Sequence, residues 1–210
     1  MLRLSAGVHA AAVGEDLVFL DERADRYLCV VGARALGLLS AEDCPAEAES
    51  LAALGAAGLI EAGAPLAPIG VDWPLPERDL RASGAEVRKG DMAQALWCLA
   101  DAARHYRGRS FEAILQLGRT RPERARNDPS ELSALAARFQ AWAPFAPGTS
   151  KCLLRAFMLL RLLRREGFDA RWVFAVRTWP FAAHCWLQLD DLALDGEVER
   201  LAAYVPILVV

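Results

Sequence analysis

Residues 150–176 read SKCLLRAFMLLRLLRREGFDARWVFAV, and the spacing of apolar residues changes within this stretch. From Cys152 to Glu166 the apolar side chains follow a helical period, and Gly167 is suited to end the helix. From Ala170 the period becomes two, which is typical of a strand. Helices followed by terminal antiparallel strands predict that the C-terminal part of the chain is an α+β domain.

Two further strands are expected downstream, AHCWLQL at 183–189 and LALD at 192–195. The pair Asp190-Asp191 between them suits a two-residue hairpin turn. Such a turn fixes the register, because a slip of one residue would move every side chain to the other face. The register then pairs Leu189 with Leu192, Gln188 with Ala193, Leu187 with Leu194 and Trp186 with Asp195.

The N-terminal part of the chain has a different pattern of apolar and turn-forming residues. Residues 7–31 contain three short strand-like runs separated by turn residues. From Gly32 the spacing becomes helical, with Leu36 and Leu39 on one face, and a second helix is expected over about residues 46–57. Three strands with helices predict a small winged-helix-like unit.

A stretch rich in proline and glycine, residues 61–84, separates the two parts. Proline removes a backbone donor and breaks helices, so this stretch is expected to be a linker. Helical spacing resumes at Glu86 and predicts three helices before residue 150. We therefore expect two domains, residues 1–80 including the linker and residues 81–210.

Composition limits the function. The chain has 210 residues, of which 54% are hydrophobic and 24% charged, as expected for a folded core. A net charge of -3 and a pI near 5.7 disfavour a nucleic-acid partner. The apolar runs are broken by arginine before the ~20 residues that cross a bilayer, so no membrane partner is expected. Five cysteines without a CxxC pair, and a start unlike a secretion signal, indicate a cytoplasmic protein.

Cys152 is the first candidate for chemistry. Thr149 or Ser150 is expected to cap the helix, which places Cys152 in the first turn. Free N–H groups and the helix dipole stabilise a thiolate at that position, so it suits a nucleophile. The alternative is a small apolar side chain at the end of a core helix.

His184 and Asp195 complete a possible triad. His184, Trp186 and Gln188 share one face of their strand, while Cys185 takes the opposite face. The expected register places Asp195 diagonal to His184 on the same face, where a carboxylate can orient an imidazole. The alternatives are a core histidine and a strand-end acid. Two other carboxylates also remain open as the triad acid, Glu197 directly opposite His184 and Asp191 if the turn is longer.

Trp186 and Gln140 are further candidates for the site. Trp186 is either a wall of the substrate cleft or a core aromatic. Gln140 is a possible oxyanion donor, although the backbone N–H of Cys152 is the better candidate. No metal site is expected, because Cys185 faces away from His184 and His105 has no ligand-like partner at i+4.

At these residues the chain resembles a known family. The run at 150–176, the His-x-Trp at His184 and Trp186, and the downstream Asp195 resemble the transglutaminase-like, papain-like cysteine proteases that mature lasso peptides. That family often places a leader-binding recognition element for ribosomally made, modified peptides ahead of the protease. The N-terminal strands, RYLCVV at 26–31 among them, resemble this element, so the resemblance covers the whole chain.

The resemblance implies a leader peptidase without a cofactor. Its partners would be the leader region of a precursor peptide and a separate ATP-dependent lasso cyclase, and threonine would stand next to last in the leader. The leader would add to the exposed strand of residues 26–31, its apolar side chains resting on a helix. Alternatives are an acyl transferase on the same Cys-His-Asp scaffold and a non-catalytic leader-binding protein. The implied leader-binding residues are Tyr27, Leu28, Val30, Leu51 and Leu54.

Overall fold

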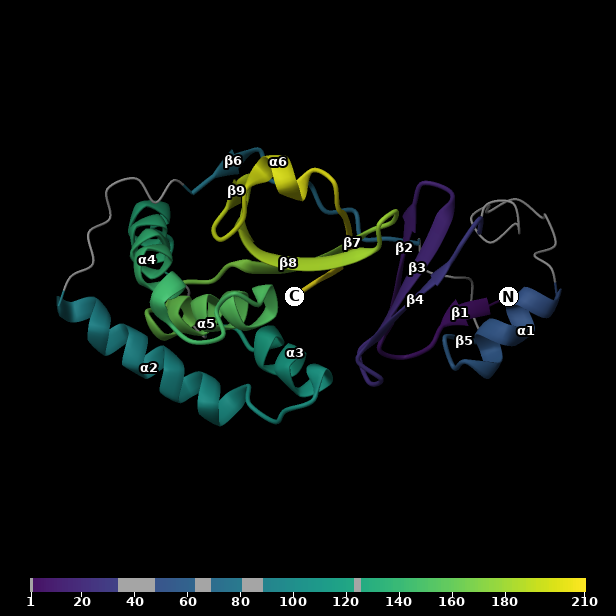
Figure 1. Ribbon diagram of the computed structural model, residues 1–210, viewed down its shortest axis with the longest axis horizontal. Coiled ribbons are helices and arrows are strands. Elements are labelled where there is room, and N and C mark those ends of the chain that lie inside the picture. Colours follow the sequence, from purple (N-terminus) through teal and green to yellow (C-terminus); the bar gives the residue numbers. More distant parts are fainter. Residues whose placement is uncertain (1, 34–47, 63–68, 81–88, 123–125) are drawn as a thin grey trace. The chain divides into compact units, whose positions relative to one another are not determined.

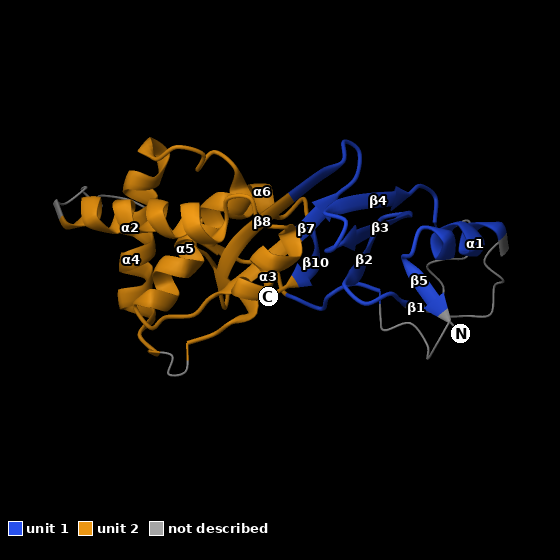
Figure 2. Cartoon of the chain, turned by 90° about the horizontal axis from the view of Figure 1, so that it is seen from below, with its two compact units in different colours: residues 1–73, 175–183, 205–208 blue, residues 74–174, 184–204, 209–210 orange. Residues whose placement is uncertain are grey.

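A computed structural model describes residues 2–33, 48–62, 69–80, 89–122 and 126–210. The chain divides into two compact units (Figure 2). The first unit comprises residues 1–73, 175–183 and 205–208, and the second comprises residues 74–174, 184–204 and 209–210. Helices and antiparallel strands both contribute to the fold, so the predicted α+β class is confirmed.

The first unit contains a three-stranded antiparallel sheet in which β3 is central and β2 and β4 are the edges (Figure 1). Its strands correspond to the three runs predicted within residues 7–31. The register pairs Phe19 of the central strand with Ala10 on one side and Leu28 on the other. The strands are β2 (Val8–Val13), β3 (Asp16–Asp21) and β4 (Arg26–Val30).

One helix, α1 (Ala48–Ala56), contributes to the apolar core of this unit. Leu54 is buried there, and Leu51 packs against the same cluster. A separate two-stranded sheet, β1 (Leu2–Leu4) with β5 (Ile60–Ala62), was not predicted, because three residues are too short to show an alternating pattern. The helix expected from Gly32 through Leu36 and Leu39 lies outside the described residues.

The second unit is built around helix α5 (Cys152–Arg165), which packs against α2 (Lys89–His105) and α4 (Pro129–Trp142). Its apolar positions are almost all buried, as the sequence predicts. Arg161 of α5 donates two hydrogen bonds, of 2.8 and 2.9 Å, to the Asp101 carboxylate of α2. His105 Nδ1 lies 2.9 Å from an oxygen of the same carboxylate, so it joins this hydrogen-bonded group.

A five-stranded sheet follows the helices, in the order β10-β7-β8-β9-β6. Strands β7 (Arg171–Arg177), β8 (Ala182–Leu189) and β9 (Leu192–Ala193) were predicted, whereas β10 (Val205–Val209) was not. β6 (Arg78–Asp79) lies within the predicted linker and pairs in parallel with β9. The end of that proline-rich stretch is therefore part of a sheet.

Close packing joins α3 (Phe111–Arg119) to this sheet. Gly118 lies against the fully buried Trp172 of β7, and a Cβ at that glycine would stand 3.0 Å from a ring carbon. Only glycine permits this approach without a shift. Among the described residues, none of the helices has the length and apolar character that a membrane span requires.

Candidate active site

Helix α5 begins at Cys152, with Lys151 in the capping position and no side-chain cap. The predicted cap by Thr149 or Ser150 is therefore wrong. The Thr149 hydroxyl is instead 2.6 Å from the carbonyl oxygen of Ala143 and 2.8 Å from that of Ala146. These bonds hold the loop that precedes the helix. Cys152 still lies in the first turn, where backbone N–H groups have no partner within the helix.

His184 lies on β8, is half-buried, and has two aromatic rings near its own ring. Its ring centroid is 6.3 Å from that of Trp186 and 5.6 Å from that of Tyr204. Trp186 is fully buried and donates from Nε1 to Gln188 Oε1 at 3.1 Å. Of the two interpretations of Trp186, the structure favours the core aromatic, which supports the histidine ring from within the sheet.

The hairpin turn that sets the position of Asp195 is the predicted two-residue turn. Gln188 pairs with Ala193 and Leu189 with Leu192, so the first two predicted pairs are confirmed, but β9 ends at Ala193, before the predicted pairs of Leu194 and Asp195. Asp190 has φ 50°, as a tight two-residue turn requires. Just beyond β9, the Asp195 Oδ1 accepts a 2.6 Å hydrogen bond from the Leu187 backbone N–H. The carboxylate is thus held by the strand that carries His184.

The two other carboxylates are engaged elsewhere. Both oxygens of Asp191 accept 2.6 Å hydrogen bonds from the exposed Arg78. Glu197 is exposed, precedes helix α6 (Val198–Leu201), and lies 3.8 Å from the Arg200 guanidinium. Asp191 is not among the residues that line the cavity described next. Geometry therefore favours Asp195 over both as a partner for His184.

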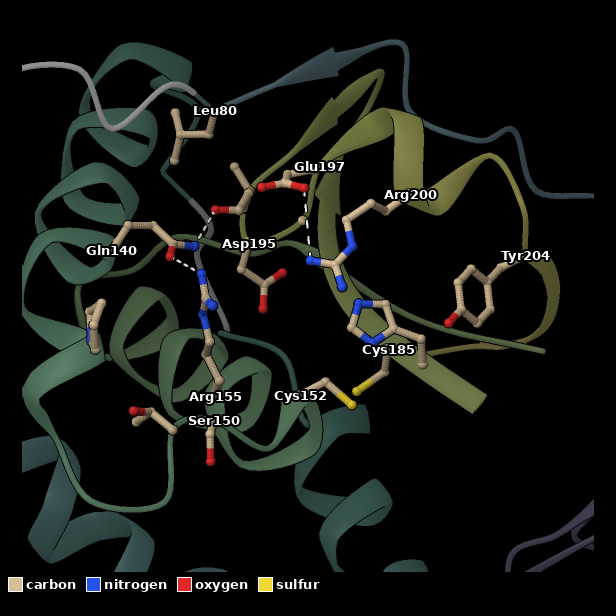
Figure 3. A pocket seen from close by; sticks show the side chains of 15 residues that line it. Leu80, Gln140, Ser150, Cys152, Arg155, Cys185, Asp195, Glu197, Arg200 and Tyr204 are labelled. Carbon is tan, nitrogen blue, oxygen red and sulfur yellow. Dashed lines mark hydrogen bonds and ion pairs between the residues drawn. The ribbon is translucent and has the colours of Figure 1, made fainter. Parts of the chain in front are cut away.

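A cavity of about 450 Å³ brings the predicted triad together (Figure 3). Cys152, His184 and Asp195 all line it, and they come from a helix start, a strand and the loop after a hairpin. Polar and charged side chains form much of the remaining wall. Among these are Gln140, Thr149, Arg155, Glu197, Arg200 and Tyr204.

The surroundings of Cys152 favour its anion. The pKa of Cys152 is lowered to about 4, and the largest cause is a hydrogen bond from the Cys185 thiol. Hydrogen bonds from His184 and from the Cys185 backbone, and the charge of His184, lower it further. Burial opposes this shift. Cys152 is therefore a thiolate at neutral pH, which is the reactive form of cysteine.

Cys185 is the site residue that sequence reasoning missed. The alternation of side chains along β8 correctly places Cys185 and His184 on opposite faces of the strand. Helix α5 nevertheless begins at a point where both side chains can reach Cys152. Figure 3 shows the sulfur atoms of Cys152 and Cys185 directed at each other. Cys185 is buried, and burial together with the neighbouring thiolate raises its pKa well above the usual value. It is a neutral thiol that donates.

The negative charge of Asp195 is less stable than that of the Cys152 thiolate. Burial of its carboxyl group and the nearby Cys152 thiolate raise its pKa to about 6, although the Leu187 N–H and the charges of Arg155 and His184 oppose the rise. Asp195 is ionised at neutral pH, but it accepts a proton at a higher pH than a surface aspartate does.

Arg155 and Gln140 form the wall beside this carboxylate. Gln140 donates from Nε2 to the Leu194 carbonyl at 2.8 Å and accepts a hydrogen bond from Arg155 (Figure 3). The amide nitrogen thus holds the chain just before Asp195, and the amide oxygen is engaged by Arg155. This arrangement makes Gln140 a support of the loop and a poor oxyanion donor. Arg155, one turn after Cys152, had no signal in the sequence beyond its position in an apolar helix.

The predicted peptide-binding residues of the first unit lie on or beside the edge strand β4. Leu28 and Val30 are partly buried against the cluster that contains Leu54, and Leu51 packs against the same cluster. Tyr27 lies on the same strand, with its ring centroid 5.8 Å from that of Phe181. These side chains therefore form part of the first unit, whereas the triad belongs to the second.

A comparison with known protein families matches the part of the chain that carries these residues. Residues 95–209 match the family described as Transglutaminase-like superfamily, which covers more than half of the chain. No curated protein and no solved structure shows a significant match. Among the described residues, no group of three or more His, Cys, Asp or Glu side chains is placed to hold a metal ion. The chain belongs to the transglutaminase-like superfamily.

Proposed function

We propose that the chain is a cysteine peptidase that removes the leader from a lasso peptide precursor. The single observation that carries the proposal is the Cys152 thiolate, which shares one cavity with His184 and Asp195. Membership of the transglutaminase-like superfamily is consistent with a cysteine peptidase or an acyltransferase. The lasso precursor as substrate rests on the resemblance of residues 150–176 and of the N-terminal strands to that protease family.

In the first half of the proposed reaction, the Cys152 Sγ attacks the scissile carbonyl carbon. The oxyanion takes a hydrogen bond from the Cys152 backbone N–H, which has no acceptor within the helix. His184, as imidazolium, gives its proton to the leaving amine of the core peptide. The products of this half are the free core peptide and a thioester between Cys152 and the leader.

In the second half, water hydrolyses the thioester. His184, now neutral, accepts a proton from the attacking water, and collapse of the tetrahedral intermediate releases the thiolate and the leader acid. Asp195 acts through His184: its charge stabilises the imidazolium, and its hydrogen bond from Leu187 fixes where that charge lies. The neighbouring Trp186 and Tyr204 rings restrict the movement of the imidazole.

The first unit is proposed to bind the leader. β4 is an edge strand of its sheet, and an extended peptide can add to such an edge through backbone hydrogen bonds. Leu28, Val30 and Leu51, which are only partly buried, offer apolar surface beside that edge. The core peptide would pass to a separate ATP-dependent lasso cyclase as a partner.

The test uses a synthetic leader–core peptide with threonine next to last in the leader, analysed by mass spectrometry. The expected result is a single cut after the leader, lost in Cys152→Ala and retained in the matched control Cys98→Ala, which removes a different buried thiol. Added hydroxylamine distinguishes the two chemistries. A peptidase yields mainly the leader acid, whereas a leader hydroxamate as the main product, with little hydrolysis, would indicate an acyl transferase.

A further inference from the structure

The neighbour of the Cys152 thiolate is itself a thiol. Cys152 and Cys185 are free cysteines on α5 and β8, and their side chains are joined by a hydrogen bond. Figure 3 shows the two sulfur atoms side by side at the wall of the cavity. The two residues stand 33 positions apart in the sequence, so this contact is a product of the fold.

The two thiols differ in their access to solvent. Cys152 is half-buried and lines the cavity, so a small solute can reach it. Cys185 also lines the cavity, but only 3% of its surface is exposed. An oxidant in the cavity therefore meets Cys152 more readily than Cys185, and Cys185 lies beside Cys152.

We propose that Cys152 and Cys185 form a peroxide-reactive dithiol, in which a hydroperoxide oxidises Cys152 and Cys185 resolves the product into a reversible disulfide. This chemistry is separate from peptide cleavage and does not require the proposed function to be correct. It would protect the nucleophile from irreversible oxidation.

The first step oxidises one sulfur. The Cys152 thiolate attacks an oxygen of hydrogen peroxide, the O–O bond breaks, and hydroxide leaves; the sulfur is oxidised to a sulfenic acid and the peroxide is reduced. The thiolate is the reactive form, and the hydrogen bonds of Cys185 and His184 keep Cys152 in that form.

The second step forms the sulfur–sulfur bond. The Cys185 sulfur attacks the Cys152 sulfur, the S–O bond breaks, and the departing hydroxide combines with the Cys185 proton to give water. Before oxidation, burial, the bond to Cys152 and the charge of the thiolate all hold the pKa of Cys185 high. The sulfenic acid is neutral, so formation of that acid removes the charge that opposes loss of the Cys185 proton.

The chain contains a useful contrast in Cys98. This thiol is 1% exposed on α2, and burial raises its pKa to about 12. Burial and the charge of Asp101 both act against its thiolate. Cys98 should therefore resist the peroxide concentration that oxidises Cys152.

The experiment treats the purified full-length protein with hydrogen peroxide and maps the cysteines by mass spectrometry without a reducing agent. In the wild type, the expected product is a Cys152–Cys185 linked peptide that has lost two hydrogens and that dithiothreitol returns to the thiols. In Cys185→Ser, the hydroxyl can still donate to the thiolate but cannot form a disulfide. That variant should instead accumulate sulfinic and sulfonic acid at Cys152. Cys98→Ala should behave as the wild type.

Two results would overturn the proposal. One is sulfinic acid at Cys152 of the wild type with no linked peptide at any peroxide dose. The other is equal overoxidation of Cys152 in the wild type and in Cys185→Ser. Should Cys185→Ser fail to fold, the presence or absence of the linked peptide in the wild type still decides the matter. The readout is a mass, so it stands whether or not the protein cleaves a leader peptide.

Discussion

The two units offer binding surfaces of different kinds. The cavity of the second unit gathers a thiolate, an imidazole and a carboxylate from a helix start, a strand and a loop. The pKa values of the thiolate and of the carboxylate both depend on neighbouring charges. The β4 edge of the first unit offers backbone groups and partly buried apolar side chains. Loss of one group should abolish chemistry in the cavity, whereas at the strand edge it should only weaken binding.

The largest expected effect is at the nucleophile. Cys152→Ala should lower kcat for leader–core cleavage by about six orders of magnitude, the scale seen when a protease loses its nucleophile. Leader affinity should stay nearly unchanged, because the site proposed for it lies in the other unit. Product masses and peptide binding by fluorescence anisotropy check both statements. Wild-type turnover by this variant would exclude Cys152 as the nucleophile.

The acid is next. Asp195→Asn should keep the shape of the site yet lower kcat by about 10⁴-fold, as the matching change does in a serine triad. Glu197→Gln is the matched control and should cost little, because Glu197 is exposed and paired with Arg200. Rates at saturating peptide, with folding verified by circular dichroism, decide between them. A near-normal Asp195→Asn beside an impaired Glu197→Gln would move the role to Glu197.

The pH dependence separates the thiolate from the acid. The lowered pKa of Cys152 means that its anion persists down to about pH 4, so alkylation by iodoacetamide should be lost only as the pH falls through that value. The raised pKa of Asp195 means that its charge is lost on passing below about pH 6, so cleavage should fall at that higher pH. Coincident acid limbs for cleavage and alkylation would contradict separate roles for the two groups.

The smallest expected effect is at the strand edge. Tyr27→Ala should weaken leader affinity by about tenfold, the range of an interface aromatic worth more than about 1 kcal/mol. The value of kcat at saturating peptide should not change, since Tyr27 is not in the cavity. Val13→Ala on β2, the opposite edge, is the control. Equal loss of affinity in both variants would argue against β4 as the leader site.

Local patterns in the sequence predicted the parts of the fold that depend on neighbouring residues. The period change after Gly167 located α5 and β7, and the Asp190-Asp191 turn fixed the register that carries Asp195. What stayed hidden depends on distant contacts. β6 forms only because β9 is beside it, and the Thr149 hydroxyl bonds to preceding carbonyls in place of the helix.

The same distinction applies within the site. The alternation of side chains along β8 correctly predicted which face of the strand carries His184. No pattern near Cys185 in the sequence indicates that the start of α5 lies beside it. Likewise, Arg155 and Gln140 acquire their role from a bond between two helices. Residues that act through a partner far away in the sequence could not be found from patterns of spacing.

The central claim is that Cys152 forms a covalent bond with the leader, and trapping that intermediate tests it most directly. The protein is mixed with leader–core peptide, quenched in acid within the first turnover, and weighed intact and after digestion. The expected result is an added mass equal to the leader acid less one water, located on Cys152 as a thioester that hydroxylamine removes, and no adduct on Cys152→Ala. Cleavage that proceeds without any adduct, with Cys152→Ala as active as the wild type, would contradict a covalent role for Cys152.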